Sequence, residues 1–223
     1  METLRRNLRG ILASLPDSIK LVAVSKFHPV EAIRAAYDEG QRIFGESRAA
    51  ELVAKVKELP DDIQWHFIGH LQTNKVRAVV PHVSLVHSID SERLLLAVDS
   101  EAGRAGRCVD ILLQLHVAQE DTKYGFSPQE LVGLVSSGII DRLHNVRVRG
   151  VMGMASNTDD TARIETDFRT IKETFDRIKA LPVKDKDAFD VISMGMSEDY
   201  PLAIKCGSNM VRIGSGIFGN REY

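Results

Sequence analysis

Eight short apolar segments, each followed by a helical pattern, constrain the fold of this chain more than any other feature. The segments predicted to be strands are 21–25, 42–45, 64–68, 84–88, 109–117, 146–151, 189–193 and 210–213. The predicted helices between them are 29–39, 47–58, 72–79, 91–103, 128–137, 159–180 and 199–206, and a final turn follows Gly216. Strict alternation of strand and helix predicts a parallel sheet with right-handed crossovers. Eight such units in 223 residues predict a closed (β/α)8 TIM barrel, with a doubly wound open sheet as the alternative.

The N-terminal segment adds a helix to this pattern. Apolar residues recur on one face of residues 2–14, and Pro16 ends the segment. No linker rich in proline, glycine or serine and no low-complexity segment interrupts the chain. We therefore expect residues 1–223 to form a single domain, with the first helix outside the eight repeating units.

Composition excludes several classes of protein. The chain is 43% hydrophobic and 27% charged, with a net charge of -2, which is typical of soluble globular proteins and gives no electrostatic footprint for nucleic acid. No apolar run approaches the ~20 residues that span a bilayer, and the polar N-terminus is unlike a secretory signal. Cys108 and Cys206 lie far apart and form no CxxC motif, which favours a reducing compartment. We expect a cytoplasmic protein with neither a nucleic acid nor a membrane as partner.

Lys26 stands at the carboxyl end of the first predicted strand. A strand that is buried on both faces offers no low-cost place for an ammonium group, because burial without a partner costs free energy or lowers the lysine pKa. Lys26 is therefore either a surface residue just past the core or an amine kept partly neutral for nucleophilic work, such as Schiff-base formation.

The last two strands end in segments that could bind an anion. Ser193-Met-Gly-Met-Ser197 and Gly214-Ser215-Gly216 each precede a helical segment, so glycine allows close approach while N–H groups at the helix start favour negative charge. In a TIM barrel the loops after strands seven and eight frequently bind phosphate. Two ordinary Gly/Ser caps are the alternative. Arg212, between apolar strand residues, predicts either an interior ion pair or a donor to a ligand.

Two further features leave alternatives open. His66 and His70 are four residues apart, but they fall on a strand and the turn after it, so we expect a hydrogen-bonded histidine and no zinc site. The loop of residues 118–127 is long enough to be a lid or a solvated connection.

Several of these motifs together resemble a known family. The matching stretches are Ala23-Val24-Ser25-Lys26, Phe44-Gly45-Glu46, Trp65-His66-Phe67-Ile68-Gly69, Leu71-Gln72-Thr73-Asn74-Lys75, Gly150-Val151-Met152, Ser193-Met194-Gly195-Met196-Ser197, and Met210-Val211-Arg212-Ile213-Gly214-Ser215 through Ile217-Phe218-Gly219. In this order and at these separations, the chain resembles the pyridoxal 5′-phosphate (PLP) homeostasis proteins over nearly its whole length. The resemblance implies a barrel like the N-terminal domain of alanine racemases, without their C-terminal β-domain.

The resemblance also implies a set of PLP-binding residues. Lys26 would carry PLP as a Schiff base (an internal aldimine), and Arg212 would approach the pyridine nitrogen. The phosphate would be held by Ser193, Gly195, Met196, Ser197, Gly214 and Ser215. Further cofactor contacts are expected from Ser47, His66, Ile68 and Met152. The chain departs from the family where Ser47 replaces a usual Asn, Ser215 a frequent Thr and His70 a common Pro.

Two functions follow from this resemblance, a non-enzymatic protein that buffers and delivers PLP and a PLP-dependent amino-acid racemase. Arginine is a permanent donor, so it leaves the pyridine nitrogen unprotonated and makes the ring a weaker electron sink. Racemisation also needs an acid/base opposite the lysine, a role for which Tyr124 in the long loop is the candidate that we name. We favour the carrier, with no catalytic residue, a monomeric state and PLP-dependent apo-enzymes as possible acceptors. A Schiff-base aldolase acting on a phosphosugar is a third class, which cofactor colour would exclude.

Overall fold

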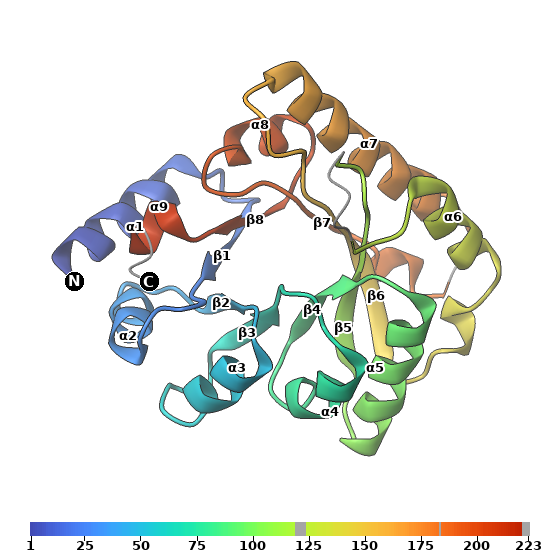
Figure 1. Cartoon of the computed structure of the whole chain (residues 1–223), viewed down its shortest axis with the longest axis horizontal. Coiled ribbons are helices and arrows are strands. Elements are labelled where there is room, and N and C mark those ends of the chain that lie inside the picture. The colour runs from blue at the N-terminus through green and yellow to red at the C-terminus, as the bar shows by residue number, and fades with distance from the viewer. Residues whose placement is uncertain (119–123, 183, 220–223) are drawn as a thin grey trace.

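The computed structural model describes residues 1–118, 124–182 and 184–219, and its eight parallel strands close into a barrel in sequence order, β1 to β8 (Figure 1). The strands are β1 Lys20–Val24, β2 Ile43–Glu46, β3 Gln64–Phe67, β4 Leu85–Ile89, β5 Val109–Gln114, β6 Val146–Met152, β7 Val191–Ser193 and β8 Met210–Ile213. β1 pairs with both β2 and β8, which closes the ring. The TIM-barrel prediction is therefore confirmed, and the open-sheet alternative is wrong.

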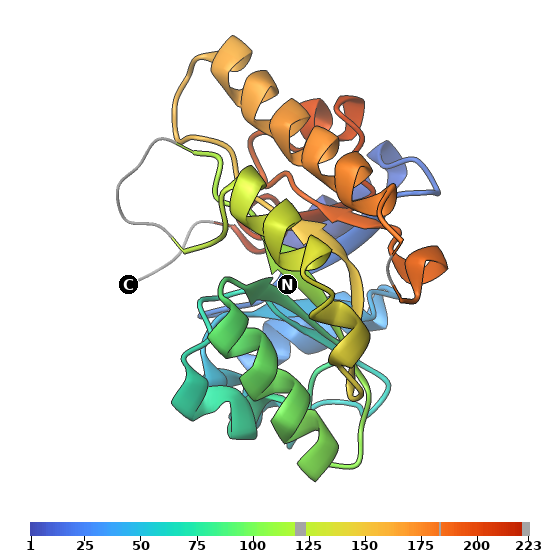
Figure 2. The ribbon, with the colours of Figure 1, turned by 90° about the vertical axis from the view of Figure 1, so that its right-hand side faces the viewer.

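Helices cover the outside of the barrel. They are α1 Glu2–Ser14, α2 Val30–Asp38, α3 Ala49–Val56, α4 Val76–Val79, α5 Glu92–Arg104, α6 Pro128–Ser136, α7 Thr161–Lys179, α8 Tyr200–Lys205 and α9 Ser215–Phe218, with short 3-10 turns η1 Thr73–Lys75, η2 Ile140–Arg142 and η3 Lys186–Ala188. The extra N-terminal helix is confirmed as α1, which lies beside α9, while α6 and α7 lie side by side on the outer surface (Figures 1 and 2). In the part of the chain that the structure describes, no helix is long and apolar enough to cross a membrane.

Alternate strand residues face opposite sides of the barrel wall, as the twofold side-chain period of a strand requires. Val22 belongs to a small apolar cluster inside the barrel, which β2 and β4 to β8 complete. Its neighbours Leu21 and Ala23 belong to the large cluster between the strands and the helices. This alternation decides which side chains at the strand ends can reach the barrel mouth.

Strand boundaries agree with the predicted ones to within two residues, with one clear exception. The fifth strand was predicted over 109–117 but ends at Gln114. The loop returns against the chain at this point, since the His116 amide donates to the Phe126 carbonyl at 2.8 Å and the Phe126 amide donates to the Gln114 carbonyl at 2.9 Å. The apolar run therefore continues past the sheet into a loop that packs against the barrel.

Candidate functional site

A cavity of about 730 Å³ lies at the carboxyl ends of the strands, within the size range of sites that hold small molecules. Seven of the predicted site residues line it: Lys26, Ile68, Met196, Ser197, Arg212, Gly214 and Ser215. They come from the ends of β1, β3, β7 and β8. The structure thus brings together the strand-end lysine, the arginine and parts of both anion-binding segments that the sequence predicted.

Five predicted site residues lie outside the described lining of this cavity. Ser47 packs beside Gly69, where a Cβ would come within 2.4 Å of the Ser47 carbonyl oxygen. Met152 belongs to the apolar cluster inside the barrel, and His66 and Ser193 are buried in the barrel interior. Gly195 shapes the turn after β7, because its φ is 96° and a Cβ there would lie 2.6 Å from Ala203.

The position of Lys26 follows from the alternation along β1. Val22 and Val24 point inward, so Lys26, two residues further on, points to the same side, and Val24 and Lys26 both line the cavity. The chain then turns sharply, with Phe27 in the left-handed region at φ 68° and the His28 amide donating to the Ser25 carbonyl at 3.1 Å. Lys26 therefore stands at the mouth of the barrel, two residues past the end of β1.

The loops after β7 and β8 bring backbone N–H groups to one side of the cavity. The amides of Gly214 and Gly216 both donate to the Ser197 hydroxyl, each at 3.3 Å. The Met196 amide donates to the Asp199 carboxylate at 2.6 Å. Backbone amides in loops of this kind are suited to bind an anion. Here they donate to oxygen atoms of the protein's own side chains. The predicted start of the helix after β7 is refined, because Asp199 is the N-cap and α8 begins at Tyr200.

Asp199 was missed as a cavity residue. Burial raises the pKa of its carboxyl group, opposed by the hydrogen bond from the Met196 amide and by the charge of Arg212. Sequence reasoning also missed Gln114 and His116 as cavity residues, and it placed Met154 only among the strand ends expected at the mouth; all three line the cavity, at or after the ends of β5 and β6. Gln114 and His116 escaped the rule that strand ends converge because the fifth strand was predicted to continue to residue 117.

Arg212 is held in the barrel interior by oxygen acceptors. Its side chain donates to the carbonyl and hydroxyl oxygens of Ser193 at 2.8 and 2.7 Å, and to the Gly153 carbonyl at 3.1 Å. Burial lowers its pKa to about 10, so the guanidinium stays charged at neutral pH. No ion pair with a carboxylate is formed by Arg212 within the described residues, so the predicted alternative of an interior ion pair with a glutamate is not supported.

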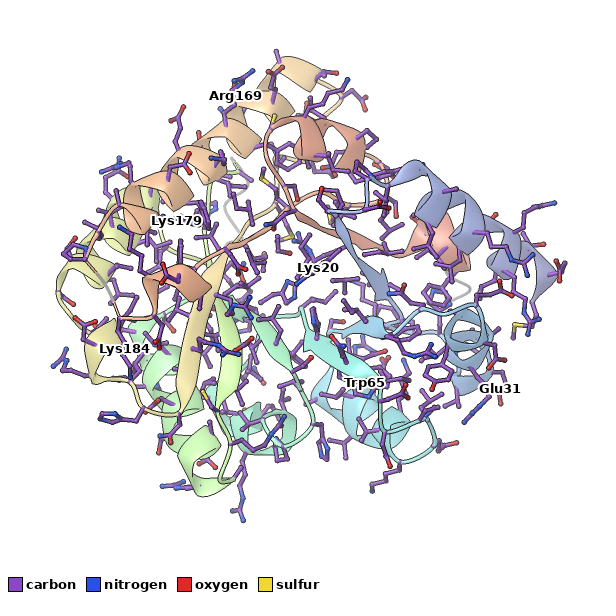
Figure 3. All side chains as sticks on the ribbon, turned by 180° about the vertical axis from the view of Figure 1, so that it is seen from behind. Lys20, Glu31, Trp65, Arg169, Lys179 and Lys184 are labelled. Carbon is purple, nitrogen blue, oxygen red and sulfur yellow. The ribbon has the colours of Figure 1, made fainter. Side chains whose placement is uncertain are left out.

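Two buried histidines continue this polar chain across the barrel. His87 Nδ1 lies 3.0 Å from the Ser193 hydroxyl, and His87 Nε2 lies 2.9 Å from His66 Nδ1. Burial lowers the pKa of His66 to about 3, with a contribution from the charge of Lys20, and it also lowers the pKa of His87. Lys20 lies within the ring of strands when the barrel is viewed from behind (Figure 3). Both histidines are therefore neutral when the protein is folded at ordinary pH.

These neutral histidines make stability depend on pH. The pKa of His66 is about 3 in the folded chain against an ordinary 6.5, so below pH 6.5 the unfolded chain binds a proton that the folded chain does not. We expect the free energy of unfolding to fall with decreasing pH, by up to about 1.4 kcal/mol per pH unit for each histidine. His66→Asn should lower the number of protons taken up on unfolding by about one. This number follows from the slope of the free energy of unfolding against pH, measured by urea unfolding at several pH values from neutral to weakly acidic. The exposed His144→Asn is the matched control, and equal slopes for the two variants would contradict the prediction.

His70 lies apart from His66, at the rim of the barrel. Its Nδ1 is 2.8 Å from the Asp90 carboxylate, and its ring stacks on Tyr124 with centroids 3.5 Å apart. Tyr124 also lines the cavity. His66 and His70 therefore serve two separate groups of side chains, as expected from a strand that runs into a turn.

Comparison with known proteins places this barrel in a family. The sequence matches the family described as "Alanine racemase, N-terminal domain" over residues 1–222. The pyridoxal phosphate homeostasis protein of Haemophilus influenzae is 37% identical, over 93% of this chain and 87% of that protein. The chain belongs to the pyridoxal phosphate homeostasis protein family. The resemblance inferred from the sequence motifs is thereby confirmed.

Solved structures of similar sequence share the fold. PipY of Synechococcus elongatus, solved without PLP, is 35% identical with a TM-score of 0.89, over 97% of this chain and 100% of that one. A second structure of PipY, described as having PLP bound, is 34% identical with a TM-score of 0.86 over the same shares. A barrel of this architecture, 34% identical to this chain, is therefore described with PLP bound.

Proposed function

We propose that the protein binds PLP as a Schiff base with Lys26 and buffers or delivers the cofactor. The observation that carries this proposal is the placement of Lys26, Arg212 and the amides of the loops after β7 and β8 around one cavity. The lysine suits the aldehyde of PLP, the arginine suits its pyridine nitrogen, and the amides suit its phosphate. PLP, when bound, supplies an aldehyde carbon that condenses with a primary amine and releases water.

The chain's own groups divide the work of binding. The amides of Met196, Gly214 and Gly216 would donate to the phosphate in place of the serine and aspartate oxygens that now accept from them. Arg212 is fixed by Ser193 and Gly153, so its direction is set before a ligand arrives. The remaining predicted contacts, from Ser47, His66, Met152 and Gly195, would support the site through packing or through the interior hydrogen bonds.

A carrier is favoured over an enzyme by the nature of Arg212. A charged guanidinium donates to the pyridine nitrogen and keeps it unprotonated, which weakens the electron sink that racemisation needs. The names of the curated relatives support the same choice. We further propose that the protein acts as a single-domain monomer in the cytoplasm, with PLP-dependent apo-enzymes as acceptors of the cofactor.

A racemase is the alternative function, and the position of Tyr124 is the observation that supports it. Tyr124 lines the cavity together with Lys26, and racemisation needs an acid/base on the face opposite the lysine. Its ring, however, is stacked on His70 and the residue is 54% exposed, unlike a group enclosed with a substrate.

The two functions differ in what happens to the Cα hydrogen of an amino acid. We expect the protein mixed with PLP to develop the absorbance band of a protonated Schiff base. The same loaded protein, incubated in deuterium oxide with each proteinogenic amino acid, should give no exchange at Cα above that with free PLP, followed by proton NMR.

An alanine racemase assayed in parallel shows that exchange would be detected. Exchange at ordinary enzyme rates, lost in Tyr124→Phe, would establish the racemase and reject the carrier. A protein that gains no absorbance band with PLP would reject both and favour a Schiff-base enzyme of another class.

A further inference from the structure

A buried charged network lies behind β1, on the opposite side of the barrel wall from the cavity. Ser25 and Glu46 follow the outward-facing Ala23 and Phe44 by two residues, so they point toward the helices. Glu46 is fully buried, and α3 places the Lys55 side chain beside it with 8% exposure. A buried lysine is rare unless it is paired, so this network needs an explanation.

The network holds the peptide group before Lys26. Lys55 Nζ donates to the Ser25 carbonyl at 2.9 Å and to the Glu46 carboxylate at 2.8 Å. The Ser25 hydroxyl donates to the same carboxylate oxygen at 2.6 Å. Since the Ser25 carbonyl belongs to the peptide bond that leads into Lys26, its orientation is fixed by the ammonium group of Lys55.

The same network holds the peptide group after Lys26. The Phe27 amide donates to the Glu51 carboxylate at 2.9 Å, and Lys55 Nζ lies 3.3 Å from that oxygen. Phe27 adopts a left-handed backbone at φ 68°, which costs a non-glycine residue about 1–2 kcal/mol. The guanidinium of Arg48 covers its ring at 4.4 Å. The contacts from α3 and its N-cap stabilise a turn that the local sequence does not favour.

We propose that Lys55, Glu46 and Glu51 are positioning residues that set the direction of Lys26 for Schiff-base formation. This inference rests on the proposed function. Glu51 and Lys55 are four residues apart on one face of α3, so one helix turn reaches both peptide groups that flank Lys26. With its backbone held on both sides, Lys26 projects its side chain from a fixed direction, so no backbone freedom remains to be lost when its amine meets an aldehyde, which is a form of preorganisation.

The test separates positioning from simple structural support. Lys55→Met removes the ammonium group and keeps an unbranched side chain, and Lys57→Met, at an exposed position just past the same helix, is the matched control. Each protein is titrated with PLP and with pyridoxine 5′-phosphate, which has the phosphate and ring but no aldehyde. We expect Lys55→Met to weaken PLP binding by about tenfold to a hundredfold and to leave pyridoxine phosphate binding unchanged. Lys57→Met should match wild type with both ligands.

A second variant guards against loss of the fold, because Lys55→Met leaves Glu46 buried without its cation. Glu51 is partly exposed, so Glu51→Gln strands no buried charge, and we expect it to fold and to show the same selective loss to a smaller degree. In the protein without ligand, the Phe27 amide should exchange with deuterium faster in Glu51→Gln than in wild type. Equal losses for both phosphates, or no loss for PLP, would overturn the positioning role. If the wild-type protein itself forms no Schiff base with PLP, that result rejects the proposed function, whereas the outcomes above reject only the positioning role.

Discussion

Lys26→Ala should abolish the covalent retention of PLP. Wild-type protein, loaded with PLP, reduced with borohydride and denatured, should carry one pyridoxyl group per chain by mass spectrometry, and the variant none. Lys26 is the only lysine among the described residues that line the cavity, so none of those residues offers a second primary amine. The loss is expected to be complete, since a Schiff base cannot form without a primary amine.

Lys20→Ala is the matched control, because Lys20 is the first residue of the strand that leads to Lys26 and lies within the ring of strands (Figure 3). It should keep both the adduct and the absorbance band. Lys26→Ala should still bind PLP reversibly and more weakly, since the amides of the loops after β7 and β8 are unchanged. A reducible adduct of equal yield in Lys26→Ala would show that another lysine carries the cofactor.

The strand-end rule explains how much of the site could be predicted from sequence. In a parallel barrel the carboxyl ends of all strands meet at one mouth, so Lys26, Arg212 and Ser197 could be expected together although they are far apart in the chain. The direction of each side chain follows from the period of two along a strand, once one inward residue is known. The fold itself was predictable for the same reason, because each strand is a short apolar run between helices.

Pairings between distant interior side chains could not be predicted in this way. His87 meets Ser193, 106 residues away, because β4 and β7 face each other across the barrel. The sequence predicts Lys55 to be an ordinary polar residue of an amphipathic helix. Only the structure shows that its side chain points from α3 toward the strands and pairs with Glu46. Such contacts depend on strand register and on helix rotation. Apolar periodicity determines both only to within about one or two residues, which is too coarse to pair individual side chains.

Gly150 illustrates this limit most clearly, because a single residue sets the register of β6. Ile111 of β5 pairs with Val148, but Leu112 pairs with Gly150, so Arg149 is an extra residue in a bulge. Gly150 has φ 150°, and a Cβ there would lie 1.8 Å from the Val191 carbonyl oxygen of β7. Only glycine allows the two backbones to approach this closely.

Gly150→Ala should therefore destabilise the protein by more than about 4 kcal/mol, the range reserved for severe backbone or core disruption, measured by urea unfolding. Gly133→Ala is the control, since no atom lies within 4 Å of the added Cβ in α6, and it should be neutral or stabilise by up to about 1 kcal/mol. PLP binding should fall together with stability in Gly150→Ala, because the next residues of β6 deliver the Gly153 carbonyl that accepts from Arg212. A Gly150→Ala variant as stable as wild type would mean that β6 and β7 can separate without opening the barrel, and the orientation of Arg212 would then not depend on the bulge.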